Sequence, residues 1–176
     1  MAMPGDVIEN PVSGEKIVFV ETSSMTNGKY LSYDYYSKPE QPKAPRHFHP
    51  IATEEFEVVE GELSVHIGNE IRVLKKGEKI VIPPGVVHTG WNSGKSRMYV
   101  KSKISPAMAF EDYYTVAFRQ ACKGKVNKKG VPSLLQIAVL CEKTKNQLFA
   151  PYGVWFQKLF FSIAAPIGRM FGYKAS

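Results

Sequence analysis

The sequence predicts an all-β domain in residues 1–105, built as a sandwich or small barrel, followed by a helical extension in residues 106–176. Before Pro106, the apolar residues occur in short runs rich in Val, Ile, Tyr and Phe, which Gly, Asn and Pro separate. After Pro106, the apolar residues follow helical spacing. The 176 residues are 44% hydrophobic, which suits one domain with a core rather than two.

Seven strands are expected in the first 105 residues. They cover residues 16–23, 29–37, 54–60, 62–67, 70–74, 79–83 and 97–104. Gly68 and Asn69 separate two of these runs and are typical of a two-residue hairpin connection. Many short antiparallel strands at this spacing favour a sandwich or barrel.

Three helices are expected in the remainder of the chain. Ser105 and Pro106 are suited to the N-cap and first turn of the first helix. Ser133 with Gln136 has the spacing of a capping box at the start of the second. The last apolar run predicts a third helix that is kinked or interrupted at Pro166, because proline lacks the amide hydrogen.

Composition excludes several classes of protein. Residues 1–11 have neither a basic nor an apolar region of the kind found in signal peptides. No run of 18 apolar residues occurs, so we expect no membrane span. Cys122 and Cys141 match neither a zinc spacing nor a disulfide framework. We therefore expect a cytoplasmic protein with two reduced cysteines at helix positions.

The positive charge lies in the extension. Residues 1–105 carry 13 basic and 13 acidic side chains, whereas residues 106–176 carry 10 basic and 3 acidic ones. Residues 122–130 hold four lysines but no arginine or interleaved aromatic residue, so we expect no nucleic-acid partner. The third helix is apolar on nearly all sides and must be covered. We favour packing on the barrel or in a homodimer, and the alternative is a basic amphipathic anchor on a membrane surface.

Histidine is rare in this chain, yet two of its four histidines stand one residue apart. His47 and His49 lie on an extended segment, so both side chains leave the same face. Glu54 begins the next strand with apolar residues on its own face, which predicts that its carboxylate points inward. His88 follows a Pro-Pro-Gly turn. Three imidazoles and one carboxylate make a competent site for a divalent transition metal.

Two motifs in this region resemble those of the cupin superfamily. The first comprises His47, His49, Glu54 and Gly61, and the second comprises Gly77, Pro83, Gly85, His88 and Asn92. One departure is Gln41, which stands where the family often has a turn-shaping glycine. The resemblance implies a double-stranded β-helix, or jelly-roll barrel, and four metal ligands: His47, His49, Glu54 and His88. The glycines, Pro83 and Asn92 would shape turns or close the loop around His88.

The implied cofactor is iron, manganese, nickel or zinc. Four protein ligands on an octahedral ion leave two adjacent positions for substrate or dioxygen, which suits iron(II) or manganese(II). Four protein ligands would nearly complete the coordination sphere of zinc and leave little room for a substrate. Glu54 could also accept a proton from a substrate as a general base.

Two classes of function remain open at this stage. The first is a metal-dependent enzyme that acts on a small organic molecule, with an oxygenase favoured over an isomerase or decarboxylase. The second is a non-catalytic module that holds metal or a ligand as a sensor, carrier or subunit. One fold supports both, so the choice depends on the site.

Other side chains near the expected site have weaker assignments. His66 is out of phase with its apolar neighbours and is expected to face outward, and Arg46 to point away from the metal. The early tyrosines are expected to pack across strands, although one could offer a phenol to the site. They are Tyr30, Tyr33, Tyr35 and Tyr36. Inward-facing apolar residues are expected to form a pocket for a hydrophobic small molecule. They are Phe56, Val58, Leu63, Val65 and Ile82, with Val100 and Ile104.

Overall fold

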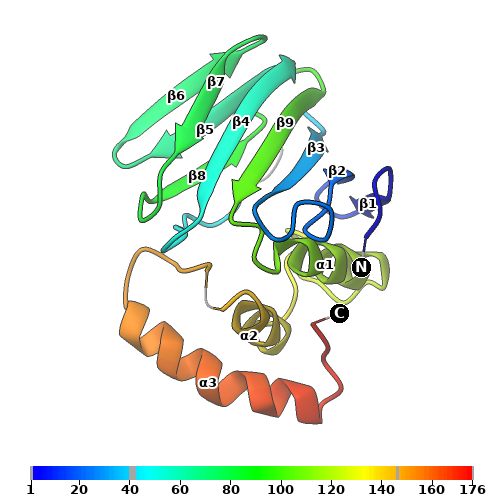
Figure 1. Ribbon diagram of the computed structural model, residues 1–176, viewed down its shortest axis with the longest axis vertical. Coiled ribbons are helices and arrows are strands. Elements are labelled where there is room, and N and C mark those ends of the chain that lie inside the picture. The colour runs from blue at the N-terminus through cyan, green and yellow to red at the C-terminus, as the bar shows by residue number, and fades with distance from the viewer. Residues whose placement is uncertain (1, 40–42, 146, 176) are drawn as a thin grey trace.

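In the computed structural model, which describes residues 2–39, 43–145 and 147–175, nine strands precede three helices (Figure 1). The strands are β1 (Val7–Asn10), β2 (Glu15–Glu21), β3 (Leu31–Ser37), β4 (Thr53–Glu60), β5 (Glu62–Ile67), β6 (Glu70–Lys75), β7 (Lys79–Ile82), β8 (His88–Trp91) and β9 (Met98–Ser105). The helices are α1 (Phe110–Cys122), α2 (Leu134–Lys143) and α3 (Val154–Met170).

The strands form two antiparallel sheets. Six strands pair in the order β1-β2-β3-β9-β4-β7, and three pair in the order β6-β5-β8. In β9, burial alternates along the strand: Met98, Val100, Ser102 and Ile104 are buried, whereas Tyr99, Lys101 and Lys103 are more exposed. A first core joins the two sheets. Its buried members are Val58, Leu63, Val65, Leu74, Ile80, Ile82, Met98 and Val100.

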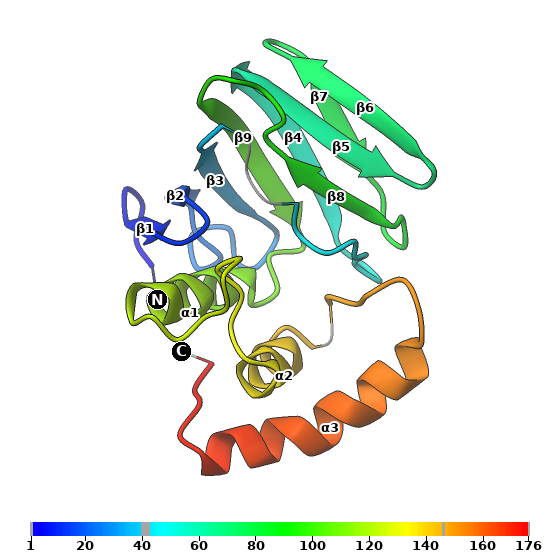
Figure 2. The ribbon, with the colours of Figure 1, turned by 180° about the vertical axis from the view of Figure 1, so that it is seen from behind.

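A second core lies between the six-stranded sheet and α1. Phe19 and Leu31 from the sheet meet Phe110 and Phe118 from the helix, all at most 7% exposed. In Figures 1 and 2, α1 lies across the ends of the strands, and α2 lies between α1 and α3. The helix α1 therefore connects the strands to the rest of the extension.

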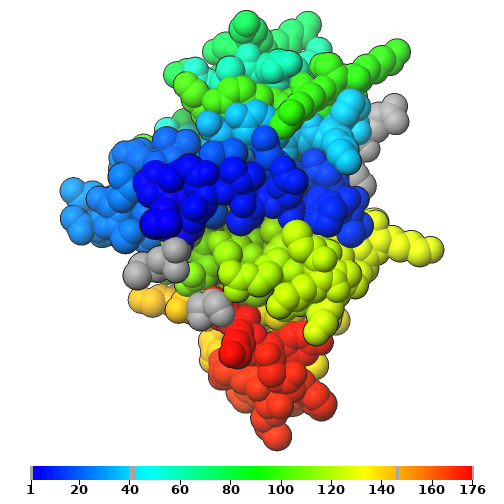
Figure 3. Space-filling view, turned by 90° about the vertical axis from the view of Figure 1, so that its right-hand side faces the viewer, coloured from blue at the N-terminus to red at the C-terminus, as the bar shows by residue number. Residues whose placement is uncertain are grey.

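A third core joins α2 to α3. Phe161, Ala165 and Gly168 of α3 face Val139 and other residues of α2. Small residues allow this close approach, since a Cβ added at Gly168 would lie 2.9 Å from Val139 Cγ2. The residues of α3 form the end of the molecule farthest from the two sheets (Figure 3). Among the described residues, no helix is both long and apolar enough to cross a bilayer.

The seven expected strands and the helical extension are confirmed, and β1 and β8 are additional. The expected start of the first helix is wrong: Ser105 ends β9, where it pairs with Thr53, and α1 begins only at Phe110. Strand pairing thus outweighs the local helix-start signal of Ser105 and Pro106.

The other helix predictions have mixed outcomes. Ser133 caps α2, because its hydroxyl accepts a hydrogen bond from the amide of Gln136 at 3.3 Å. An interruption at Pro166 is wrong, because α3 is continuous there. Pro166 lies on the exposed face, where water can bond to the carbonyl that the proline leaves free. Cys122 in α1 and Cys141 in α2 are both free thiols, as expected.

Candidate metal centre

Backbone pairing brings the three histidine segments together. His47 precedes β4 and pairs with His88, the first residue of β8, through reciprocal hydrogen bonds of 2.9 and 2.8 Å. The carbonyl of His49 accepts a bond of 2.8 Å from the amide of Gly85. Glu54, the second residue of β4, is held between Ile82 of β7 and its β9 partner. The four side chains thus start from rigid, paired backbone.

The four side chains converge on one point. One potential ligand atom from each of His47, His49, Glu54 and His88 lies within 4.8 Å of the others. The imidazole rings are separated by 4.5 to 5.5 Å between centroids. Glu54 reaches His88 Nε2 at 2.8 Å and His49 Nε2 at 3.5 Å.

Each histidine has its ring orientation and tautomer fixed by the same kind of contact. In all three, Nδ1 bonds to a backbone carbonyl, which can only accept, so Nδ1 carries the hydrogen. The acceptors are Pro45 for His47 at 3.0 Å, Gln147 for His49 at 2.5 Å and Val86 for His88 at 2.9 Å. With Nδ1 protonated, all three Nε2 atoms face the cluster, which is the arrangement that metal-binding histidines need. His88 Nε2 lies 2.8 Å from the Glu54 carboxylate, which can only accept, so without a metal His88 donates to Glu54 from this nitrogen.

Burial and the shared carboxylate determine the charges of the cluster. Glu54 is 6% exposed; burial opposes its ionisation, yet contacts with His49 and His88 hold its pKa well below the usual range. The pKa of His88 is raised, because the adjacent Glu54 carboxylate outweighs the effect of burial. Burial, and then the neighbouring His88, lower the pKa of His47 to about 4. The cluster therefore holds an ionised carboxylate beside one imidazole with a raised pKa, His88, and one with a lowered pKa, His47.

These features fit a divalent cation. Among the described residues, His49 Nε2 is a buried ring nitrogen with no hydrogen-bond partner. Such atoms are rare in native interiors and indicate a partner that is not part of the chain. A cation in contact with the four residues would satisfy this nitrogen and compensate the buried carboxylate. The donor set of three imidazoles and one carboxylate suits iron, manganese, nickel or zinc.

Comparison with known proteins identifies the family. Residues 35–101 match the model of the cupin domain, and this segment contains all four residues of the cluster. The chain therefore contains a cupin domain.

Curated cupin relatives match only in part. Oxalate oxidase 1 of Hordeum vulgare is 44% identical over 64 residues, which are 32% of this chain and 32% of that protein. An oxidoreductase of Arthrobotrys oligospora is 26% identical over 149 residues, which are 75% of this chain and 57% of that protein. The chain thus spans from about a third to just over half of the length of these relatives.

Solved cupin structures show the same fold. A protein titled a predicted oxalate decarboxylase from Thermotoga maritima has a TM-score of 0.50 at 18% identity, covering 60% of this chain and 99% of its own. A sugar phosphate isomerase of the cupin superfamily from Silicibacter pomeroyi has a TM-score of 0.50 at 14% identity, covering 58% of this chain and 72% of its own. At these identities, the likeness concerns the fold alone.

Two further residues of the cupin motifs have structural roles. Gly61 adopts a φ of +76°, and a Cβ there would lie 2.6 Å from the carbonyl oxygen of Arg97, so only glycine fits. Asn92 is fully buried and donates to the carbonyls of Lys38 and Ser96. It therefore closes the loop that follows β8. Gln41, the departure from the first motif, lies outside the described residues.

Helix α1 adds aromatic side chains that the sequence did not suggest. The ring of Phe110 meets the ring of His49 edge-on at 5.1 Å between centroids. Tyr114 places its hydroxyl 3.2 Å from the hydroxyl of Tyr33. Burial and the charge of Glu54 both raise the pKa of Tyr33, so its phenol stays protonated. The helix therefore closes one side of the cluster with rings and neutral hydroxyls.

The connection between α2 and α3 also reaches the cluster. Phe48, between the two histidines, pairs with Phe149 through backbone hydrogen bonds of 2.9 and 3.1 Å. The Gln147 side chain accepts a bond from the amide of Ile51 at 3.1 Å, and its carbonyl holds His49. Gln147 follows no recognisable motif, so only the structure could reveal this contact.

The early tyrosines, His66 and Arg46 have contacts or positions outside the set of four clustered residues. Among the early tyrosines, Tyr30 and Tyr35 donate to glutamates of β2, and Tyr36 stacks on Tyr99 at 4.6 Å. Of these tyrosines, Tyr33 is the one whose pKa is raised by the charge of Glu54 as well as by burial. His66 is half-buried on β5 and is not among the four clustered residues. Arg46 donates to the carbonyl of Gly68.

The expected apolar pocket is a packed core instead. Val58, Leu63, Val65, Ile82 and Val100 are at most 5% exposed and belong to one cluster of contacting side chains, which Phe56 also contacts. Ile104 belongs to the core beneath α1. Two cavities lie elsewhere: one of about 270 Å³ between β1 and α1, and one of about 660 Å³ beside α2 and the end of α3.

Proposed function

We propose that the cupin domain binds a divalent transition metal through His47, His49, Glu54 and His88 and uses it in oxidoreductase chemistry on a small organic molecule. The single observation that carries this proposal is the convergence of three Nε2 atoms and one carboxylate, with every Nδ1 hydrogen-bonded to a carbonyl. The proposal includes a jelly-roll barrel formed by the two sheets in residues 1–105, with residues 106–176 as an extension.

The side chains have separate tasks in this proposal. A bound iron(II) or manganese(II) ion would supply Lewis acidity and one-electron chemistry. The imidazoles keep their lone pairs directed inward because Nδ1 is held in each ring. Glu54, whose pKa is held low, is ionised at neutral pH, as a metal ligand must be. It is also the carboxylate that would accept a proton from a substrate. Phe110 and the Tyr33 and Tyr114 hydroxyls shield the site from water on the side of α1.

The names of two relatives support the oxidoreductase part. One relative is an oxalate oxidase, and another is an oxidoreductase. Both align over only part of their length, so their activities indicate the class of reaction and not the substrate. A small organic acid is therefore the first substrate class to test.

A second candidate is a non-catalytic metal-binding module, such as a sensor, carrier or subunit. The observation that favours it is the packed core of Val58, Val65 and their neighbours, which occupies the space expected for a hydrophobic substrate. A small polar substrate would still have access beside His47, which is only partly buried.

The test begins with metal content. The purified protein should contain close to one equivalent of a transition metal by elemental analysis, and a His88→Ala variant should lose it while His66→Ala retains it. Oxygen uptake by the iron(II)- and manganese(II)-loaded protein is then measured with oxalate, keto acids, catechols, flavonols and thiols. Metal binding without turnover would favour the module, and an absence of metal from the wild type would overturn the proposal.

Glu54→Gln separates the two roles of the carboxylate. If Glu54 is a base, turnover should fall more than metal content, because three imidazoles remain to hold the ion. Equal losses of both would reduce Glu54 to a ligand alone.

A further inference from the structure

The outward face of α3 is apolar and uncovered. Trp155 is 66% exposed, Phe156 69%, Ile163 56% and Met170 85%. Leu159, Phe160 and Ile167, at 40–45% exposed, complete this outer face of α3. The opposite face is buried on α2 through Phe161 and small residues. Contiguous apolar patches of this kind mark surfaces that bind another molecule or a membrane.

Basic side chains predominate in the last part of the chain. From Lys143 to the C-terminus, the sequence has five basic side chains and no Asp or Glu. Arg169 pairs with Glu142, and Lys143 lies 3.6 Å from Asp112. Neither Lys145 nor Lys174 forms an ion pair with a described residue. On α3 itself, Lys158 and Arg169 are the charged side chains, so the helix that bears the apolar face is basic and has no acidic residue.

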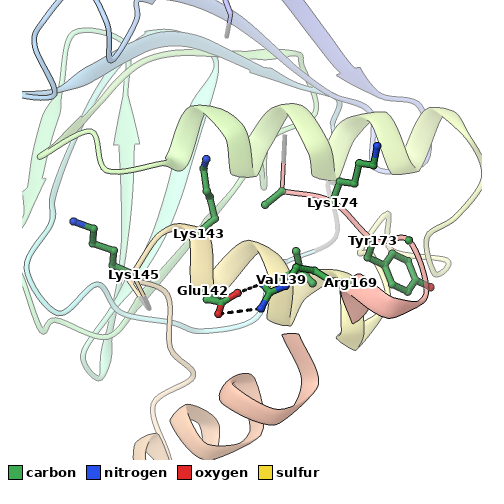
Figure 4. A pocket seen from close by; sticks show the side chains of 9 residues that line it. Val139, Glu142, Lys143, Lys145, Arg169, Tyr173 and Lys174 are labelled. Carbon is green, nitrogen blue, oxygen red and sulfur yellow. Dashed lines mark hydrogen bonds and ion pairs between the residues drawn. The ribbon is translucent and has the colours of Figure 1, made fainter. Parts of the chain in front are cut away.

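A basic cavity borders the C-terminal end of α3. It has a volume of about 660 Å³, and Figure 4 shows the Glu142–Arg169 pair within it. Val139, Tyr173 and Ala175 are among the residues that line it. Four basic side chains and one acidic side chain line it: Lys143, Lys145, Arg169, Lys174 and Glu142. Its charge and size suit an anionic headgroup.

We propose that the outer face of α3 and this basic cavity dock the protein on an anionic lipid bilayer. The helix would lie along the bilayer surface, with the side chains from Trp155 to Met170 entering the boundary between headgroups and acyl chains. Lys145 and Lys174 would contact lipid phosphates. Trp155 at one end of the helix and Tyr173 beyond the other have the amphipathic rings that membrane interfaces favour.

A second copy of the chain suits this surface less well. In a two-fold pair of α3 helices, the outer faces would meet each other and bring their basic flanks together. No acidic residue after Glu142 is present to pair with Lys158 or Lys174 across such an interface. Like charges at an interface oppose association, whereas anionic lipids compensate the same charges.

The direct test is co-sedimentation of the full-length, metal-loaded protein with phosphatidylcholine vesicles, without and with phosphatidylglycerol. Binding is expected only with the anionic lipid and should weaken as salt is added. Acyl chains brominated at a known depth should quench Trp155, whereas Trp91, which is 7% exposed, should be unaffected. A Trp155→Phe variant should lose the quenched signal.

Paired variants test the apolar face. Phe156→Ser combined with Ile163→Ser should weaken binding by more than about tenfold, because two large side chains no longer enter the bilayer. Val73→Ser combined with Val81→Ser is the matched control, since both residues are about half exposed on strands β6 and β7. The control should bind as the wild type does.

Paired charge reversals test the lipid chemistry. Lys145→Glu combined with Lys174→Glu should weaken binding by about tenfold or more. Lys76→Glu combined with Lys95→Glu makes the same change in net charge on exposed residues outside the extension and should have a smaller effect.

Three results would overturn the proposal. Equal binding to neutral and anionic vesicles would remove the role of the basic cavity. Absence of vesicle binding would show that a bilayer is not what covers the outer face of α3. A wild-type dimer that Phe156→Ser with Ile163→Ser converts to a monomer in the ultracentrifuge would make a second copy the occupant, as the sequence favoured. None of these readouts depends on the activity of the metal centre.

Discussion

The His/Glu cluster and the outer face of α3 depart from ordinary folding rules in opposite ways. The cluster buries an ionised carboxylate and leaves the Nε2 atom of His49 without a hydrogen-bond partner among the described residues. The outer face of α3 exposes large apolar side chains such as Trp155 and Phe156. A buried polar atom that lacks a partner and an exposed apolar side chain are both unfavourable in water.

This contrast shows what each region requires to complete it. The cluster is rigid and small, and a single cation could satisfy it from within. The outer face is broad and can be covered only from outside. The two regions are connected through residues 147–149, because Gln147 holds His49 and Phe149 pairs with Phe48 just before the chain enters α3. A change at α3 therefore has a short physical route to the cluster.

The largest effect is expected on the free energy of unfolding, from substitutions on the buried face of α3 compared with those on its outer face. Phe161 is 8% exposed and contacts Phe149, so Phe161→Ala should lower the free energy of unfolding by about 3–5 kcal/mol. Its neighbour Phe160 is 42% exposed, and Phe160→Ala should cost less than about 1 kcal/mol. Urea unfolding measures both. Similar losses would show that the outer face is covered in the free protein and would remove the contrast.

The next effect concerns the cluster. His88→Ala removes an inward Nε2 and should weaken metal binding by more than about 100-fold, beyond the range of substitutions that only support a ligand. His66→Ala is the matched control and should leave the Kd unchanged, because His66 lies outside the cluster. Titration with manganese(II) or zinc(II) gives both values. Unchanged affinity in His88→Ala would exclude this residue as a ligand.

Much of this arrangement follows from local sequence. The period of two in the apolar pattern gave seven strands, and the spacing from His47 to His88 gave the four clustered residues, because each lies on or beside a strand whose facing is fixed by its neighbours. The helix start predicted at Ser105 is wrong, since the pairing of Ser105 with Thr53 depends on a residue far away in the sequence. The approach of Gln147 to His49 is likewise a long-range contact.

Gln147 tests whether the two regions are coupled. Gln147→Ala leaves the amide of Ile51 without its acceptor and loosens the carbonyl that orients His49, so metal affinity should fall by about tenfold. Gln157→Ala is the control, because the Gln157 side chain also bonds to backbone, at Ala150, but does not touch a histidine segment. Equal metal affinity in the two variants would mean that the extension packs beside the cluster without positioning it.

The smallest effect is expected at the hydroxyl pair that closes the cluster beneath α1. Tyr33→Phe removes one partner of the contact of 3.2 Å and leaves the hydroxyl of the partly buried Tyr114 without this partner, which should cost about 1 kcal/mol of stability. Tyr30→Phe, which removes a bond to Glu21 nearer the surface, should cost less. Metal affinity should be unchanged in both variants, because neither phenol is in the set of convergent ligand atoms. A Tyr33→Phe protein that loses metal would instead place the phenol among the groups that hold the ion, and the metal site would then include a residue that contacts α1.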